Sequence, residues 1–212
     1  MKNTEYLLSF ARRVGKKLSP TQKEILNKAI TEKSADKLSF ETNKSEVILE
    51  IGSGMGDFLS KLVLAEKNKM FIACEPYLNG LISLIQKSQG PENLYLWPDD
   101  ARILLSKLPD HFIDTVYVLF PDPWPKKSHQ KKRVINDFLL KLLHQKLKSR
   151  GNVKIATDDT NYAQWILMKF INCGLFEWKA RNNFHAEFAE FTQTKYYKRS
   201  INKPYFFEFF SC

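Results

Sequence analysis

The fold is decided by one stretch of sequence, Val47-Ile48-Leu49-Glu50-Ile51-Gly52-Ser53-Gly54-Met55-Gly56. Its first half, residues 47–51, is a short apolar run that predicts a buried β-strand. Its second half is rich in glycine, which lets a backbone turn tightly and approach a ligand closely. The segment 57–67 predicts a helix, whose first N–H groups would point toward the same ligand. Strand, turn and helix together are typical of the first unit of an α/β fold.

The rest of the chain continues this alternation of short apolar runs and helical segments. The predicted strands after the first lie at 70–74, 94–97, 115–120, 153–156, 176–181 and 205–210, and the predicted helices at 78–88, 101–108, 133–148 and 161–173. This rhythm predicts an α/β fold with a doubly wound, mostly parallel, seven-stranded Rossmann-like sheet and helices on both faces. We expect the last two strands to form an antiparallel C-terminal edge.

The region before residue 40 is polar and basic, in contrast to the alternating apolar segments of the rest of the chain. Ser19 and Pro20 match the N-cap and the first position of a helix. We therefore expect residues 1–40 to be a basic, helical N-terminal extension and residues 41–212 to be a single domain. A chain of 212 residues is long enough for one domain with a substantial core.

The charge balance points to a polyanionic partner. Lysine and arginine number 33 against 23 acidic residues, which gives a net charge of +10. Such an excess fits nucleic acid or a membrane surface, although a generic basic protein is the alternative. The cysteines lack the spacing of a zinc or disulfide framework, and the histidines form no metal-ligand motif. The sequence contains no signal peptide or membrane span, so we expect a cytoplasmic protein that needs neither metal nor membrane.

Carboxylates follow three of the predicted strands and suggest the ligand. Glu50 lies at the end of the first strand, Glu75 after the second and Asp100 after the third. Ligands bind at the carboxyl ends of strands in this architecture, where Glu75 can accept from ribose hydroxyls and Asp100 can reach an adenine amino group. The predicted contacts of the ligand with the glycine-rich turn are Gly52, Gly54 and Gly56.

The spacing of these glycines argues against a dinucleotide. The third glycine arrives one residue too early for the pyrophosphate fingerprint. A carboxylate at Glu50 also suits a ligand that carries an amine better than it suits a pyrophosphate. S-adenosylmethionine, with its sulfonium and amino groups, fits both observations. A nicotinamide-dependent oxidoreductase remains the alternative for this part of the chain.

A second motif follows the fourth predicted strand, Phe120-Pro121-Asp122-Pro123-Trp124-Pro125-Lys126-Lys127, and continues into a basic segment that ends at Arg133. The prolines stop the strand and stiffen the chain. A carboxylate, a large aromatic ring and several cations within so short a segment suit a site for a polar base with phosphates beside it. A proline-rich turn with a solvated basic face is the alternative interpretation.

Together the two motifs resemble the bacterial tRNA (guanine-N7-)-methyltransferases, a class I family that uses S-adenosylmethionine. The resemblance covers most of the chain, and the Phe-Pro-Asp-Pro-Trp block with its lysines is its most specific part. It also includes residues 9–13, Asp100-Ala101, residues 156–158 and the segment Thr194-x-Tyr196. It implies methyl transfer to N7 of a guanosine in the tRNA variable loop, with tRNA as the partner. We expect the protein to be a monomer or weak homodimer.

The resemblance also implies roles for individual residues. S-adenosylmethionine would be bound by Glu50, Glu75, Asp100 and Asp122. The tRNA guanosine would be contacted by Lys126, Asp158 and a C-terminal segment that contains Thr194, Tyr196 and Tyr197. The family usually has glutamate at the position of Tyr197, so this chain cannot supply a carboxylate there.

The expected chemistry needs no general base, because guanine N7 has a lone pair and no proton. Asp122 is the predicted catalytic residue, stabilising the charge that develops on the base. It would alternatively grip the guanine edge or the cofactor, or cap the prolines. Trp124 would stack on a base or pack the loop, and Asp158 would bind guanine or cap the next helix. The predicted phosphate contacts are Lys126, Lys127, Lys131, Lys132 and Arg133, together with an N-terminal cluster for which a solvated helix face is the alternative, Arg12, Arg13, Lys16 and Lys17. A non-catalytic RNA-binding module is a further alternative.

Overall fold

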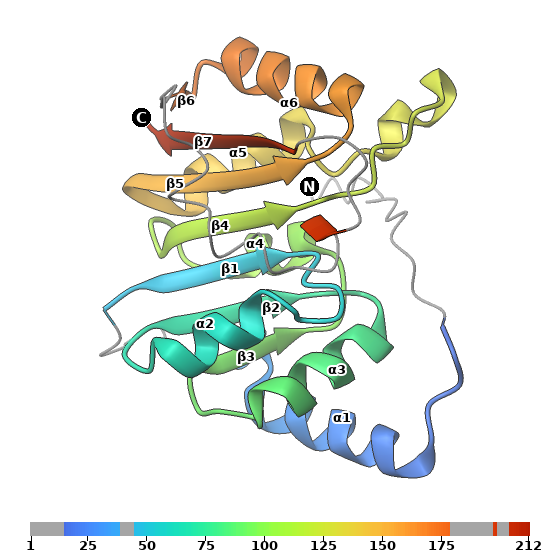
Figure 1. Ribbon diagram of the computed structural model, residues 1–212. Helices are drawn as coiled ribbons and strands as arrows, with labels where there is room; N and C mark the ends of the chain where they lie inside the picture. The colour runs from blue at the N-terminus through green and yellow to red at the C-terminus, as the bar shows by residue number, and fades with distance from the viewer. Residues whose placement is uncertain (1–14, 39–44, 179–196, 199–203) are drawn as a thin grey trace, which may run out of the picture.

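A computed structural model describes residues 15–38, 45–178, 197–198 and 204–212. Its centre is a seven-stranded sheet with the strand order β3-β2-β1-β4-β5-β7-β6 (Figure 1). The strands are β1 (Val47–Ile51), β2 (Met70–Cys74), β3 (Leu94–Trp97), β4 (Ile113–Leu119), β5 (Leu147–Thr157), β6 (Phe176–Trp178) and β7 (Tyr205–Ser211).

Strands β1 to β5 run parallel to one another, and β7 runs antiparallel to both β5 and β6. The central strands β1 and β2 are buried along their whole length, because helices cover both of their faces. This explains why they read as continuous apolar runs rather than alternating ones. The predicted fold class is confirmed, with β7 placed between β5 and the edge strand β6.

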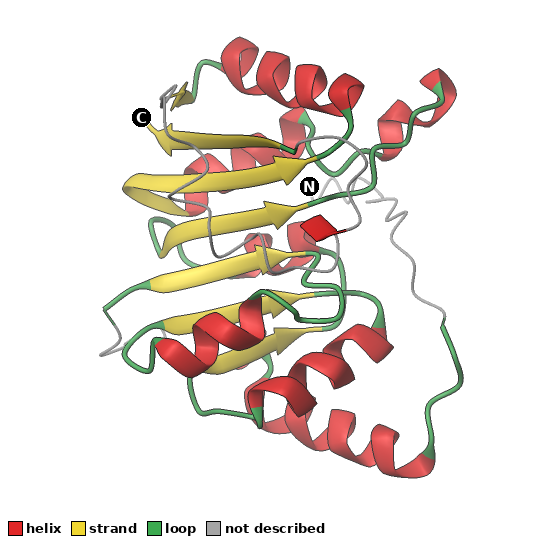
Figure 2. Ribbon diagram, viewed as in Figure 1, coloured by secondary structure: helices red, strands yellow, loops and turns green. Residues whose placement is uncertain are grey.

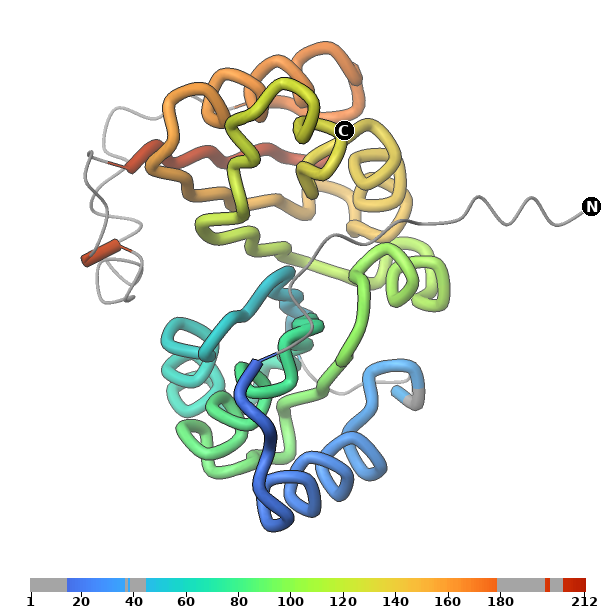
Figure 3. Tube along the Cα trace, turned by 90° about the vertical axis from the view of Figure 1, so that its right-hand side faces the viewer, coloured from blue at the N-terminus to red at the C-terminus, as the bar shows by residue number. Residues whose placement is uncertain are grey.

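The helices lie in two layers on opposite faces of the sheet, as Figures 2 and 3 show. One hydrophobic cluster joins the sheet to α1, α2 and α3, and the other joins it to α4, α5 and α6. The helices are α1 (Pro20–Lys33), α2 (Leu59–Ala65), α3 (Leu78–Ser88), α4 (Ala101–Lys107), α5 (Asp137–Lys146) and α6 (Thr160–Cys173), and two short 3₁₀ turns are η1 (Ala35–Lys37) and η2 (Lys127–Lys132).

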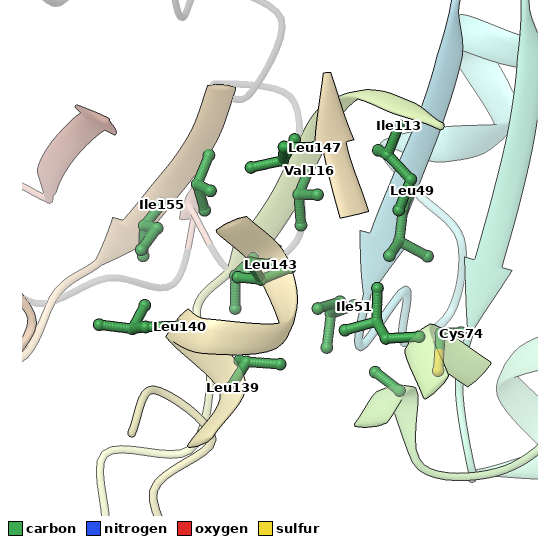
Figure 4. Packing of buried hydrophobic residues seen from close by; sticks show 14 of the residues in the cluster. Leu49, Ile51, Cys74, Ile113, Val116, Leu139, Leu140, Leu143, Leu147 and Ile155 are labelled. Atoms are coloured by element: carbon green, nitrogen blue, oxygen red, sulfur yellow. The ribbon is translucent and has the colours of Figure 1, made fainter. Parts of the chain in front are cut away.

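The larger cluster lies between the sheet and the layer of α4, α5 and α6. Figure 4 shows Leu139, Leu140 and Leu143 of α5 against side chains of the central strands. These leucines recur at the helical spacing that places them on one face. The cluster reaches the carboxyl end of β1 through Ile51, so it fixes the edge of the sheet where the glycine-rich turn begins.

Capping side chains set where several helices begin. Ser19 is the N-cap of α1, as predicted, and it also forms a capping box with Gln22. Asn136 accepts a hydrogen bond from the backbone N–H of Leu139, so α5 begins at Asp137 rather than at the predicted residue 133. The preceding basic segment forms η2 instead. The lysine-rich segment is therefore a separate 3₁₀ turn and not the first part of α5.

The described part of the predicted N-terminal extension is helical and packs on the domain. Leu26 of α1 is buried in the same cluster as residues of α3 and β3. Ala35 and Leu38, which follow α1, are buried in the opposite cluster. Residues 26–38 therefore contribute to both sides of the sheet.

Candidate active site

A cavity of about 400 Å³ opens at the carboxyl ends of the central parallel strands. Figure 3 faces this edge of the sheet. Each strand from β1 to β4 sends its following loop to the cavity, which brings together residues far apart in the sequence. The predicted residues among its lining are Gly52, Gly54, Glu75, Asp100, Asp122, Trp124 and Lys132.

The glycine-rich turn leaves room for a ligand at Gly52, whereas at Gly56, which does not line the cavity, an added Cβ would collide with Leu84 of α3. Gly52 has φ +79°, and a Cβ added there would meet no atom within 4 Å. A ligand can therefore come directly against this part of the backbone. Gly80, in the first turn of α3, has no such room, because its Cβ would collide with the carbonyl oxygen of Gly54. The sequence motif did not reveal Gly80, which allows α3 to press against the turn.

Glu75 ties the turn to the end of β2. Its Oε2 accepts a hydrogen bond from the backbone N–H of Gly54 at 2.7 Å, and its Oε1 accepts one from Tyr77 at 2.8 Å. Burial raises the pKa of Glu75, and the nearby Asp122 carboxylate adds to this effect. Each carboxylate oxygen keeps a second lone pair, so the group can still accept hydrogen bonds from a diol in the cavity.

Asp100 lines the cavity and also holds the start of α4. Its Oδ1 accepts a hydrogen bond from the backbone N–H of Arg102, and its Oδ2 lies 2.7 Å from the guanidinium of the same residue. The carboxylate is therefore held in one orientation by both a helix cap and an ion pair. The neighbouring Asp99 lines the cavity as well.

Glu50 faces a small hollow of about 20 Å³ beside the main cavity, lined also by Ser53, Phe58 and Phe120. The residue is only 2% exposed, and its Oε2 has no hydrogen-bond partner. The hydroxyl of Ser53 is buried without a partner too. Burial, followed by the charges of Glu75 and Asp57, raises the pKa of Glu50 to about 8. Two unpartnered polar groups that line the same hollow fit a ligand that carries an ammonium group. The motif predicted Glu50 but gave no signal for Ser53.

The loop after β4 carries Asp122 to the mouth of the cavity. Phe120 and Trp124 have φ values of +50° and +42°, which are rare for large side chains. Asp122 between them is exposed and lines the cavity, and no residue in the described ranges donates a hydrogen bond to its carboxylate. The geometry therefore argues against the alternative in which Asp122 caps the proline-rich turn.

Trp124 packs against η2 while part of it lines the cavity. Its ring makes an edge contact with His129, with the centroids 5.7 Å apart, and the Nζ of Lys132 lies 4.6 Å from its centroid. The cation of Lys132 thus stabilises the ring from one side. Packing within the loop does not exclude contact with a ligand, because Trp124 packs on η2 and also lines the cavity.

The basic segment divides into exposed and buried side chains. Lys126, Lys127 and Lys131 are exposed, as phosphate contacts require. Arg133 is 1% exposed, and its guanidinium bonds to Pro123 and Asn161 inside the protein. The prediction that Arg133 meets an RNA phosphate is therefore wrong for this structure, because its charged end is enclosed.

The start of α6 excludes one of the two predicted roles of Asp158, that of helix cap. The side chain that caps α6 is Asp159, whose Oδ1 accepts a hydrogen bond from the N–H of Tyr162 at 2.7 Å. Asp158 is not the cap, and it lies half-buried directly after the strand. Tyr197 is half-buried and packs against the cluster that contains α2 and α3. The predicted residues Arg12, Arg13, Thr194 and Tyr196 lie outside the described residues.

Strand order, cavity and glycine-rich turn define a Rossmann-like methyltransferase, and the comparisons agree. A family model described as "Putative methyltransferase" matches residues 44–204. The chain is 37% identical over 203 residues to a tRNA (guanine-N(7)-)-methyltransferase of Wolbachia pipientis, covering 94% of this chain and 89% of that protein. The chain belongs to the tRNA (guanine-N7-)-methyltransferase family.

Other relatives are consistent with this assignment. A tRNA (guanine-N(7)-)-methyltransferase of Hyphomonas neptunium is 33% identical, with 95% of this chain and 98% of that protein covered. A "Bifunctional methyltransferase" of Rickettsia prowazekii is 35% identical over 92% of this chain, which spans only 38% of that protein. The crystal structure of the aminoglycoside resistance methyltransferase NpmB1 matches with a TM-score of 0.57 at 17% identity, covering 83% of this chain and 95% of that one. At so low an identity this last likeness concerns the fold alone.

Two further features concern the described part of the chain. None of its helices is long and apolar enough to cross a membrane. No group of three or more histidine, cysteine or acidic side chains there is arranged to hold a metal ion.

Proposed function

We propose that the protein transfers the methyl group of S-adenosylmethionine to N7 of a guanosine in the variable loop of tRNA. The observation that carries this proposal is the meeting of two motifs in one cavity. The glycine-rich turn after β1 and the Phe120–Trp124 loop after β4 both line it. One motif suits the methyl donor, and the other suits a base attached to a polyanion.

Several residues would hold S-adenosylmethionine, which supplies an electrophilic methyl group on a sulfonium. Glu75 offers lone pairs to ribose hydroxyls, and Asp100 lies where an adenine amino group can reach the cavity wall. Gly52 leaves its backbone open to the ligand. The unpartnered Oε2 of Glu50 and hydroxyl of Ser53 suit an amino group. These features support the cofactor by their chemistry: Glu75 and Asp100 present further acceptor sites to the cavity, and Glu50 and Ser53 have polar atoms without a hydrogen-bond partner.

The acceptor makes a modest chemical demand. Guanine N7 attacks with its lone pair and loses no proton, so the protein's task is to place the base and to stabilise the positive charge it gains. Asp122, exposed at the cavity mouth, is suited to that electrostatic task. Correct placement of two reactants supplies about 7–11 kcal/mol in favourable systems. Positioning is therefore the main contribution that we assign to this site.

The tRNA would be held by the exposed lysines of the same loop. Lys126, Lys127 and Lys131 project from the segment that follows Asp122, so phosphates bound there would lie near the cavity. The half-buried Asp158, released from any capping role, is available for the guanine edge. The net charge of +10 supports attraction of RNA over a longer range.

A matched pair of tRNA transcripts tests the acceptor atom. One contains guanosine and the other 7-deazaguanosine, which has carbon in place of N7. With labelled S-adenosylmethionine, the proposal expects label only in the guanosine transcript, while both transcripts bind the protein equally well. Equal labelling of the two transcripts would contradict transfer to N7. Binding of both without label in either would favour a non-catalytic RNA-binding module.

A further inference from the structure

Arg133 is enclosed although it ends a run of exposed basic residues. It is 1% exposed and is among the largest fully buried side chains in the described part of the chain. Its guanidinium carbon lies 4.9 Å from the ring centroids of both Tyr162 and Trp165, which belong to α6. The charged group is thus held between two aromatic rings of a helix on one side and the loop after β4 on the other.

The hydrogen bonds of Arg133 reach the loop itself. Its Nε donates to the backbone carbonyl oxygen of Pro123 at 2.8 Å, and its Nη2 donates to Oδ1 of Asn161 at 2.7 Å. Its Nη1 is buried without a partner. An unpaired buried donor costs about 1–3 kcal/mol. A methionine would fill the same space between the rings without this cost, so packing alone does not account for an arginine.

The hydrogen bond from Arg133 to the Pro123 carbonyl restricts rotation of a peptide group in this part of the loop that the prolines leave free. Pro121, Pro123 and Pro125 each fix their own φ angle. The peptide group between Pro123 and Trp124 can turn only through ψ of the first residue and φ of the second. Arg133 holds the carbonyl oxygen of that peptide group. Trp124 has φ +42°, a conformation that a large side chain keeps only when its surroundings impose it.

The backbone next to Arg133 is hydrogen-bonded to side chains of α6. The indole N–H of Trp165 donates to the carbonyl oxygen of Ile135 at 2.8 Å, and the N–H of Ile135 donates to the hydroxyl of Tyr162 at 3.3 Å. The backbone two residues after Arg133 is therefore held to α6 by the same two aromatic side chains that enclose the guanidinium. The residues on either side of Pro123 are Asp122 and Trp124, and both line the cavity.

We propose that Arg133 is a positioning residue, which holds the Pro123 carbonyl so that Asp122 and Trp124 face the acceptor base. The role of the loop in binding the acceptor base rests on the proposed function. Its placement by Arg133 can be measured without an activity assay. Arg133 touches neither the tRNA nor the methyl donor. Its effect is carried entirely through the loop.

Kinetics separates this role from a phosphate contact. Arg133→Met keeps the stacking but removes the donors, and Lys141→Met removes an exposed charge of α5 as the matched control. A displacement of about 1 Å in a reacting group costs roughly 100-fold in rate. We expect Arg133→Met to lower kcat at saturating tRNA and donor by about that factor, with KM for tRNA changing less than about twofold. Arg133→Lys can still donate a hydrogen bond to Pro123, so its kcat should lie between those of the wild type and Arg133→Met.

Fluorine NMR reads the loop itself. With 5-fluorotryptophan incorporated, the resonance of Trp124 is assigned by its loss in Trp124→Phe, and Trp97 serves as the internal reference. We expect the Trp124 resonance to shift or broaden in Arg133→Met while that of Trp97 stays in place. Circular dichroism melting is measured on each variant, and all comparisons are made well below the lower melting temperature.

The outcomes are distinct. An unchanged Trp124 resonance in Arg133→Met would overturn the positioning role, whether or not the wild type is active. A tRNA affinity that falls, with a salt slope lower by about one and kcat unchanged, would also overturn it in favour of a phosphate contact. A wild type that gives no methylated tRNA, together with a displaced Trp124 resonance, would contradict the proposed function and leave the anchoring of the loop supported.

Discussion

The buried carboxyl group of Glu50 makes the stability of the ligand-free protein depend on pH. Burial, with the charges of Glu75 and Asp57, raises its pKa from 4.5 to about 8. Lys87 pairs with Asp57 and leaves Glu50 without a cation of its own in the described hollow. Between these pH values the unfolded state binds fewer protons than the native state, so the free energy of unfolding falls as pH rises. The stability is fully present below pH 4.5 and is lost as pH rises through about 8.

The size of the effect follows from the shift in pKa. Each pH unit inside this window lowers the free energy of unfolding by about 1.4 kcal/mol. Between pH 5 and pH 8, Glu50 alone should therefore lower it by about 3 kcal/mol. This is a large share of the roughly 5–15 kcal/mol that stabilises a typical domain.

The perturbation is Glu50→Gln, which keeps the shape of the side chain and removes its titration. Urea unfolding of wild type and variant at pH 5, 6, 7 and 8, without ligand, gives the difference in free energy of unfolding. The cost of burying the amide does not depend on pH, so it cancels from the trend. We expect this difference to move in the variant's favour by about 3 kcal/mol across the range. Glu24→Gln, on the exposed face of α1, is the control and should run parallel to wild type.

A difference between Glu50→Gln and wild type that stays constant from pH 5 to pH 8 would refute this reasoning. It would mean that the carboxyl group is solvated or paired in solution. Glu50 would then not be an unpaired buried group that is available to bind the amino group of the ligand.

Other predictions concern RNA contacts and packing. Lys126→Ala with Lys131→Ala should lower the salt slope of tRNA binding by roughly two, measured by filter binding, and an unchanged slope would mean that both lysines face only solvent. Asp159→Ala should lower the free energy of unfolding by about 1 kcal/mol through loss of a helix cap. Asp158→Ala should instead leave the free energy of unfolding nearly unchanged and reduce kcat/KM for tRNA. If urea unfolding showed the loss of stability in Asp158→Ala, and kinetics the loss of activity in Asp159→Ala, the two assigned roles would be exchanged. Gly80→Ala should weaken donor binding in calorimetry, because the new methyl group collides with the glycine-rich turn; unchanged affinity would show that α3 can retreat.

Local patterns predict the parts of the fold that depend on periodicity and turns. The helix 78–88 and the strand 94–97 match their predicted bounds, since apolar spacing and flanking turns fix both. The strand predicted at 153–156 extends over Leu147–Thr157, because its first half pairs with β4 across a register shift. Such pairing depends on a partner more than thirty residues away, which local sequence does not reveal.

The candidate site is predictable where a residue follows a strand in sequence. Glu75, Asp100 and Asp122 reach the cavity for that reason. The prediction for Arg133 is wrong because a basic run suggests a solvated face, whereas the rings that enclose this residue come from α6, beginning at Thr160. The two adjacent aspartates before α6 offer equal capping residues, and only the backbone geometry distinguishes Asp159 as the cap.

The most direct test of the central claim is the identity of the methylated nucleoside. Wild-type protein is incubated with labelled S-adenosylmethionine and tRNA that lacks N7-methylguanosine, and the digested tRNA is separated into nucleosides. The account predicts label in N7-methylguanosine, and loss of that label with Asp122→Ala while tRNA affinity is retained. Label in any other nucleoside, or no label although both ligands bind, would contradict it.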